Sequence, residues 1–307
     1  METQQDNSYE EINISELIAY LWASKGLIIF ITILFAAGSV TYAINTPDKF
    51  TSTALLQVQS GAKSSSNNIS QLGGIASLAG ISISSGNSNK SYYAIETLKS
   101  RDFLKHINSF KEVAPNLVAA KGYDFYKKQT VFDETQYDAK MEKWIRAETK
   151  ERKTVPSYLE VHENYMKHIN ITIDKKSGYL KIRFEHYSPE FSFSFINLLI
   201  DELNLVARQK DINESEMALE YLLNQLKTVE ASNVKNSIGQ LIDSQIERLM
   251  LANVREDYLV STIDAPFIPE ENSYPSRPMI AILGTLIGGI LVLFYVLTRY
   301  YLDKRKR

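Results

Sequence analysis

Two uninterrupted apolar runs dominate the pattern of hydrophobic and polar positions along this chain. The first is GLIIFITILFAAGSVTYAI at 26–44, and the second is MIAILGTLIGGILVLFYVLT at 279–298; neither contains a charged residue. At a rise of about 1.5 Å per residue, a helix of this length covers the roughly 30 Å hydrocarbon core of a bilayer. We therefore predict two membrane-spanning helices.

A cleaved signal peptide is the alternative for the first run. Signal peptides begin with a positively charged segment and contain a short apolar core. Here the preceding residues 1–25 are acidic, with Lys25 as their only basic residue, and the apolar run is longer than such a core. An uncleaved anchor is therefore the preferred interpretation.

Basic residues predict the orientation of the two spans. Those that follow the second run are Arg299, Lys304, Arg305, Lys306 and Arg307. Basic residues next to a span stay in the cytoplasm. We expect a cytoplasmic N-terminal segment at 1–25 that contains an amphipathic helix, and a basic cytoplasmic tail at 299–307. Residues 45–278 would then form one domain on the other side of the membrane.

This outer domain combines strand and helix patterns. FTSTALLQVQ at 50–59 and DYLVSTIDA at 257–265 predict strands, and HINITID and YLKIRFEH predict a hairpin around the turn KKSG at 175–178. A helix is expected at 91–107. Strands from both ends of the domain should meet in one mixed sheet next to the membrane, with helices packed on it. The predicted fold class is α+β.

The segment 60–90 is dense in Ser, Gly and Asn and has no sustained hydrophobic period. This composition predicts a flexible loop. Its glycines lack the lysine of a phosphate-binding loop, and GxxxxGK[ST] occurs nowhere in the chain, so nucleotide binding has no support.

A long helical region is predicted at 189–257. Ser188 and Pro189 are a plausible N-cap and first-turn proline, the pattern favours one helix to 231, and a second helical stretch begins at 237. Its middle, Arg208–Glu216, is nearly all polar. Two arrangements stay open, a helical hairpin with its own core and coiled helices that pack between subunits. Candidate contact residues for another subunit or another binding partner are Arg208, Ile212, Glu216 and Met217.

Prolines are concentrated just ahead of the second span, at Pro266, Pro269, Pro275 and Pro278. Each proline fixes its own φ, lacks an N–H donor and pushes the preceding residue toward extended geometry. We expect 264–278 to be a stiff connector that holds the second span at a defined distance from the sheet. An ordinary linker into the membrane is the alternative.

Glycines in the second span are candidates for helix packing. Gly284 and Gly288 form a GxxxG pattern, and Gly289 is adjacent. In lipid, small residues let helix backbones approach closely. These positions could contact the first span or a neighbouring subunit, or could simply face lipid.

Composition argues against several function classes. Residues 45–278 carry 28 Lys and Arg against 30 Asp and Glu, well mixed in sign, so a nucleic-acid partner is not expected. The absence of cysteine is only weakly informative. The histidines at 106, 162, 168 and 186 lack metal-ligand spacing, and no GxSxG elbow occurs. We expect no catalytic residue, metal or cofactor.

One charged stretch, DAKMEKWIRAETKERK at 138–153, has no chemical motif. We interpret it as a solvated helix with Trp144 and Ile145 on its buried side.

The order of these features resembles a known family. ISELIAYLWASK precedes the first span, PDKFTSTALLQV follows it, AIETLKSRDFL comes next, and after the long helix DAPFIPEENSYPSRP leads into a Gly-rich second span. This layout is similar to the polysaccharide co-polymerases, and among them to the Wzz-type O-antigen chain-length determinants without a fused tyrosine kinase. The resemblance covers almost the whole chain.

The resemblance implies a homo-oligomeric, octamer-like ring in the bacterial inner membrane with its main domain in the periplasm. Such a ring would set the modal length of O-antigen in lipopolysaccharide by organising a Wzy-type polymerase, by holding the growing lipid-linked polysaccharide, or both. It implies no catalytic residue and no cofactor.

Two other functions share this membrane layout. A capsule or exopolysaccharide co-polymerase subunit that partners a separate cytoplasmic tyrosine kinase would have the same spans. A two-span receptor would also have an outer domain, but the short tail at 299–307 would require a separate signalling partner.

Overall fold

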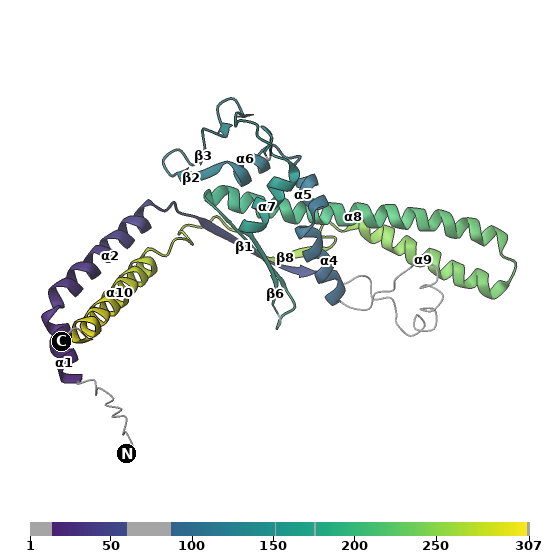
Figure 1. Ribbon diagram of the computed structural model, residues 1–307. Coiled ribbons are helices and arrows are strands. Elements are labelled where there is room, and N and C mark those ends of the chain that lie inside the picture. Colours follow the sequence, from purple (N-terminus) through teal and green to yellow (C-terminus); the bar gives the residue numbers. More distant parts are fainter. Residues whose placement is uncertain (1–13, 60–86, 151, 175, 306–307) are drawn as a thin grey trace, which may run out of the picture. The chain divides into compact units, whose positions relative to one another are not determined.

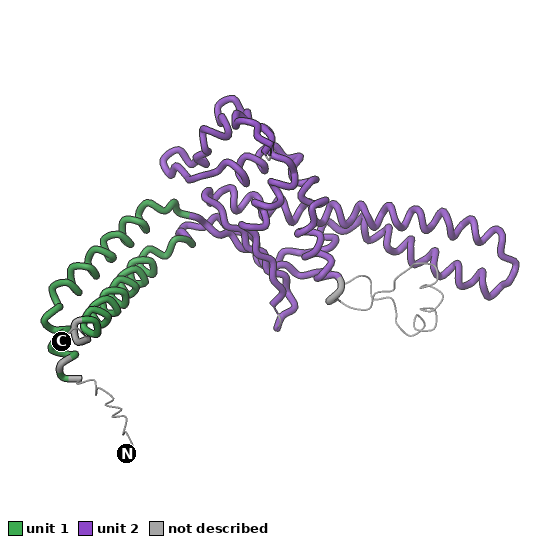
Figure 2. Tube along the Cα trace, in the orientation of Figure 1, with its two compact units in different colours: residues 1–48, 273–307 green, residues 49–272 purple. Residues whose placement is uncertain are grey.

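The computed structural model describes residues 14–59, 87–150, 152–174 and 176–305 (Figure 1). They belong to two compact units (Figure 2). Unit 1 combines Met1–Asp48 with Ser273–Arg307, and unit 2 is Lys49–Asn272. Most of the predicted loop at 60–90 lies outside the described residues, but 87–90 are helical rather than loop.

Unit 1 is helical in its described part, with α1 (Ile14–Ala23), α2 (Lys25–Asn45) and α10 (Arg277–Arg305). Helices α2 and α10 lie side by side (Figure 2). Both α2 and the Arg277–Leu302 part of α10 are long and apolar enough to cross a membrane. The rings of Tyr20 in α1 and Tyr300 in α10 are 5.2 Å apart, so α1 packs at one end of the pair.

Unit 2 is built on an antiparallel sheet with the strand order β6-β7-β1-β8. Its strands are β1 (Phe50–Val58), β6 (Ile169–Ile173), β7 (Leu180–His186) and β8 (Val260–Asp264). Pairing of β1 with β8 confirms that strands from both ends of the outer domain meet in one sheet. The expected mixture of parallel and antiparallel pairs is wrong, because all three pairings are antiparallel. The α+β class is confirmed.

The predicted hairpin is formed by β6 and β7, with Ile171 opposite Ile182. At its turn the Asp174 carboxylate accepts hydrogen bonds from the N–H groups of Lys176 at 2.7 Å and Ser177 at 3.3 Å. Gly178 has φ +73°, a left-handed conformation that glycine adopts without a steric penalty. Local turn chemistry therefore fixes the register of this hairpin.

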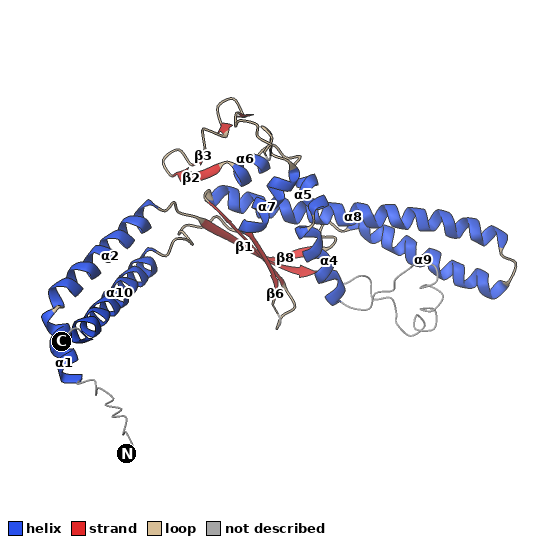
Figure 3. Ribbon diagram, viewed as in Figure 1, coloured by secondary structure: helices blue, strands red, loops and turns tan. Residues whose placement is uncertain are grey.

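Three of the shorter helices, drawn in blue in Figure 3, add buried side chains to the main core of unit 2. They are α5 (Arg101–Ile107), α6 (Val113–Val118) and α7 (Tyr158–His168). The single helix predicted at 91–107 is wrong, because α4 (Asn87–Lys99) ends before Ser100 and α5 begins after it. Ser100 is extended and its hydroxyl accepts a bond from the N–H of Phe103 at 3.1 Å, which makes it an N-cap that interrupts the helix.

The charged stretch at 138–153 is not a helix. It follows the β2 (Ala120–Asp124) and β3 (Gln129–Phe132) hairpin. It includes the second residue of β4 (Tyr137–Asp138) and all of β5 (Lys143–Trp144), which pair with each other. Asp138 accepts bonds from the N–H groups of Lys140 and Met141, an Asx turn that competes with helix formation. The expected buried side is wrong at Ile145, which is 51% exposed, whereas Trp144 is half-buried against Tyr137. The buried residue of this stretch is Arg146.

The long helices are α8 (Pro189–Thr228) and α9 (Ser232–Val254), which form an antiparallel hairpin that extends away from the sheet (Figure 1). The Ser188 hydroxyl caps α8 by accepting a bond from the N–H of Phe191 at 3.1 Å. Helix α8 ends three residues before the predicted limit at 231, and α9 begins five residues before the expected 237. The first half of α8 packs on the sheet, where Phe195, Leu199 and Leu203 join the main core.

Candidate functional site: the membrane helix pair and the helical hairpin

The α2–α10 contact depends on two of the candidate glycines. A Cβ added at Gly284 would lie 2.3 Å from the Cβ of Ser39, and one added at Gly288 would lie 2.5 Å from the Cβ of Phe35. Carbon atoms cannot approach so closely, so any larger side chain would push the helices apart. The two glycines therefore allow α10 to lie directly against α2.

Gly289 belongs to a different face of α10. A Cβ added there would meet nothing within 4 Å. Gly289 lines an open apolar groove of about 560 Å³ together with Ala281 and Thr285. The structure thus separates the candidate glycines into two that contact α2 and one that does not.

An ion pair connects the ends of the two apolar helices within unit 1. Arg277, the first residue of α10, donates from Nη2 to both carboxylate oxygens of Asp48, at 2.9 and 3.0 Å. Sequence reasoning missed this pair. Its only sequence signal is one charge just outside each apolar run, which does not reveal that the two charges meet.

The proline connector is shorter than predicted. Asp264 ends β8, and Pro278 lies in the first turn of α10, where a missing N–H is tolerated. Pro266, Pro269 and Pro275 are buried, whereas Pro278 is exposed. The Ser52 hydroxyl of β1 donates to the carbonyl oxygen of Phe267 at 2.8 Å, which ties the start of the connector to the sheet. The idea that it sets a defined distance stays a proposal.

The four candidate residues on α8 do not form one site. Arg208 is half-buried and donates from Nη2 to the carbonyl oxygen of Glu256 at 2.8 Å, near the base of the hairpin. Ile212 is half-buried, whereas Glu216 and Met217 are exposed, Met217 at 64%. The exposed members are available to a partner, and Arg208 serves the hairpin itself.

The contact between α8 and α9 follows a seven-residue spacing. Buried residues on α9 are Ile238, Gln245 and Ala252, and the outer part of α8 buries Ser215 and Leu222. A repeat of seven keeps one stripe of each helix facing the other. Within the described chain, the Ser215 hydroxyl is buried without a hydrogen-bond partner. The polar middle of α8 therefore contributes Ser215, a small polar residue, to a contact where apolar side chains are more usual.

Exposed apolar residues lie outside the α8–α9 contact. They include Met217 and Tyr221 on α8, and Ile246, Met250 and Val254 on α9. The α9 residues recur every four positions, so they lie along one side of the helix. This apolar surface is what a helix that packs against another subunit or a partner would present.

His106, His162 and His186 contact neighbouring protein groups through their ring nitrogens. Nε2 of His106 lies 2.5 Å from a carboxylate oxygen of Glu202, and Nε2 of His162 lies 2.8 Å from the carbonyl oxygen of Lys99. His186 is buried between the carbonyl oxygen of Asn116 and the N–H of Ser188, and burial lowers its pKa to about 4. Burial also lowers the pKa of His168. Across the described ranges, no three potential ligands are grouped for a metal ion.

Residues 10–109 match the family model described as "Wzz: Chain length determinant protein". The matched region contains α1, α2, β1, α4 and α5. The match agrees with the Wzz-type resemblance of the sequence over this part of the chain.

A solved structure described as a "full-length bacterial polysaccharide co-polymerase" is 15% identical to this chain, with a TM-score of 0.37. The alignment covers 94% of this chain and 97% of that one. Comparison with curated proteins finds no match.

Proposed function

We propose that this chain is a non-catalytic regulator of polysaccharide chain length that sets the modal length of O-antigen. The match of residues 10–109 to the chain length determinant family carries the proposal. Wzz and co-polymerase proteins are regulators rather than catalysts. The chemistry of glycan extension would therefore reside in a separate Wzy-type polymerase.

Chain length would be set by how long the growing glycan stays with the polymerase. A surface that organises polymerase molecules, or that holds the lipid-linked polysaccharide, alters this residence time without breaking or forming a bond. The α8–α9 hairpin supports this role because it is long, about 60 Å for the 40 residues of α8, and carries exposed apolar residues.

Assembly into a homo-oligomeric ring is part of the proposal. The apolar residues Met217, Tyr221, Ile246, Met250 and Val254 would be covered by a neighbouring subunit. Repetition of one such contact around an axis gives a closed ring when the rotation closes. An octamer-like ring is the size that the family resemblance implies.

The bacterial inner membrane is the proposed location. Two helices of sufficient length and apolarity support it, and basic residues after the second span favour cytoplasmic termini. Unit 2 would then be periplasmic. A reporter that is active only in the cytoplasm should be active when it is fused to either terminus. A periplasmic C-terminus would contradict this topology.

Gene deletion followed by lipopolysaccharide gel electrophoresis tests the proposed function. Loss of a clustered band distribution, with restoration by the plasmid-borne gene, is the expected result. An unchanged lipopolysaccharide profile with loss of capsule or exopolysaccharide would favour the alternative function, a co-polymerase subunit that partners a separate tyrosine kinase. A change in neither surface polymer would contradict both.

A further inference from the structure

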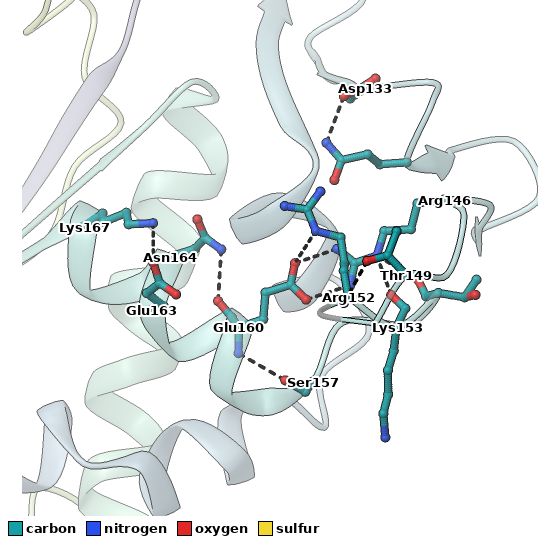
Figure 4. Close-up of polar contacts among 12 residues, drawn as sticks. Asp133, Arg146, Thr149, Arg152, Lys153, Ser157, Glu160, Glu163, Asn164 and Lys167 are labelled. Carbon is teal, nitrogen blue, oxygen red and sulfur yellow. Dashed lines mark hydrogen bonds and ion pairs between the residues drawn. The ribbon is translucent and has the colours of Figure 1, made fainter.

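A polar cavity of about 800 Å³ lies in unit 2, beside the first turn of α7. Its walls come from the loop after β5, from α7, and from Thr135 and Gln136 ahead of β4. Figure 4 labels Arg146, Thr149, Arg152, Lys153 and Glu160 of these walls, and Lys150 also lines the cavity. The volume falls in the range of pockets that hold small ligands, roughly 300–1,000 Å³. This is the charged stretch that the sequence pattern had suggested to be a solvated helix.

An ion pair between a buried arginine and a half-buried glutamate gives one wall of the cavity a fixed shape. Arg146 is 4% exposed, and its Nη1 and Nη2 donate to the two carboxylate oxygens of Glu160 at 2.6 and 2.7 Å. Its Nε donates to the carbonyl oxygens of Lys153 and Thr154 at 2.8 and 3.0 Å. The guanidinium of Arg146 therefore bonds both to the backbone of the loop and to the Glu160 carboxylate on α7. Its hydrogen bonds to the carboxylate hold the pKa of Glu160 below its usual range.

The cavity carries surplus positive charge. Arg146 neutralises Glu160, and Glu163 has its own partner in Lys167 at 2.9 Å. Lys150, Arg152 and Lys153 remain exposed at the rim, with Arg152 Nε 3.9 Å from the already paired Glu160. Within 146–153, four basic residues stand against two acidic ones, Glu148 and Glu151, of which Glu151 lies outside the described residues.

Hydroxyl donors accompany these cations. The Thr149 hydroxyl oxygen accepts a bond from the N–H of Arg152 at 3.1 Å, and the Ser157 hydroxyl oxygen accepts one from the N–H of Glu160 at 3.3 Å. Each hydroxyl proton is left to donate to a ligand. Leu159 adds an apolar surface for a ring face. Guanidinium, ammonium, hydroxyl and apolar groups together suit an acidic sugar, which presents a carboxylate, hydroxyls and C–H faces.

We propose that this cavity binds an acidic sugar unit, a hexuronate or a similar carboxylate-bearing monosaccharide, of the glycan whose length the chain controls. The inference rests on the proposed function. Arg152 and the two lysines contact the carboxylate, and Thr149 and Ser157 contact sugar hydroxyls. The Arg146–Glu160 pair positions the loop and does not contact the sugar.

Isothermal titration of the full chain in detergent with trigalacturonic acid tests the proposal. Maltotriose serves as the neutral probe and inorganic phosphate as the small-anion probe. The test variant is Lys150→Glu, Arg152→Glu and Lys153→Glu combined. Its matched control reverses three exposed lysines of the β2–β3 hairpin, Lys121, Lys127 and Lys128. Arg152→Gln provides a milder variant if the triple change impairs folding, as judged by circular dichroism.

We expect trigalacturonic acid to bind the natural chain and the control variant with similar affinity, and to bind the test variant at least about tenfold more weakly. Its affinity for the natural chain should clearly exceed that of maltotriose. Arg152→Gln should weaken it in the same direction. Equal binding to all variants, or no binding of trigalacturonic acid, would overturn the proposal. Phosphate binding as tight as the sugar would also overturn it, because the cavity would then select charge and not an acidic sugar.

These outcomes are independent of the test of the proposed function. A changed lipopolysaccharide profile on gene deletion, without binding of trigalacturonic acid, would contradict the proposed sugar site and leave the proposed function intact. Binding at this pocket, with all surface polymers unchanged on deletion, would contradict the proposed function and the assignment of the sugar to a length-controlled glycan, while binding of an acidic sugar by the cavity would stand.

Discussion

Asn204 of α8 and Val260 of β8 exchange two hydrogen bonds: Nδ2 donates to the Val260 carbonyl oxygen at 3.0 Å, and Oδ1 accepts from the Val260 N–H at 2.9 Å. The same Oδ1 accepts from the N–H of Leu259 at 2.8 Å. Asn204 is buried, so water cannot replace these bonds. One side chain thus fixes the start of the returning strand to the long helix.

Replacement of Asn204 by alanine should destabilise unit 2 by about 3 kcal/mol, because it leaves buried backbone groups of β8 without partners. Urea unfolding of the full chain in detergent, followed by tryptophan fluorescence, measures the change. Asn213→Ala, at an exposed position of the same helix, should change the unfolding free energy by less than about 0.5 kcal/mol. Equal effects of the two changes would show that Asn204 has no special role.

Gly284→Leu combined with Gly288→Leu should separate α10 from α2, since each new side chain would overlap Ser39 or Phe35. We expect a lower melting temperature in detergent, an altered native size and a shifted polysaccharide length. Gly289→Leu, on the open face, is the control for the contact with α2 and should leave the melting temperature unchanged. If the double variant matches the natural chain in all three measurements, the close contact has no role.

Ile212→Lys with Met217→Lys should loosen the ring if these residues face a neighbouring subunit, because burial of an unpaired charge is costly. Met217 is 64% exposed, so the folding of one subunit should suffer little at that position. Native size and the polysaccharide gel are measured together, with Ile212→Leu and Met217→Leu as the apolar control. An intact ring with a shifted length would indicate direct contact with glycan or polymerase. No change in either would leave this segment as a solvated stalk.

Acid should destabilise unit 2 through His186. Burial depresses its folded pKa from 6.5 to about 4, so as the pH falls from 6.5 the unfolded chain gains a proton that the folded chain does not. The linkage amounts to a loss of about 3 kcal/mol between pH 7 and pH 4. His186→Gln should be less stable at pH 7 but should lose less stability on acidification. Parallel pH profiles for the two chains would refute this assignment.

Local patterns were sufficient to predict some elements from the sequence. The β6–β7 hairpin combines two β-rich runs with a glycine that adopts positive φ, so all its determinants lie within a few residues. The α8 start was equally local, with Ser188 as its cap and a proline in the first turn. GxxxG correctly drew attention to α10, but only the structure shows which glycines face α2.

Long-range partners account for what the sequence could not show. The run at 138–153 looked like a helix because nothing local marks Arg146 as buried, and its partner Glu160 belongs to the following helix. Asp48 and Arg277 are separated by 229 positions, so no local window contains both. At Ser100, one cap residue outweighed helix-favouring neighbours.

The central claim is that this chain controls glycan length without making glycan, and one measurement tests both halves. Total O-antigen sugar and its length distribution are quantified in cells with the natural gene, without it, and with it restored from a plasmid. The account predicts that deletion replaces the clustered lengths by a broad distribution while the total sugar stays similar, and that restoration brings the cluster back. Loss of the polymer itself, or an unchanged distribution, would contradict the account.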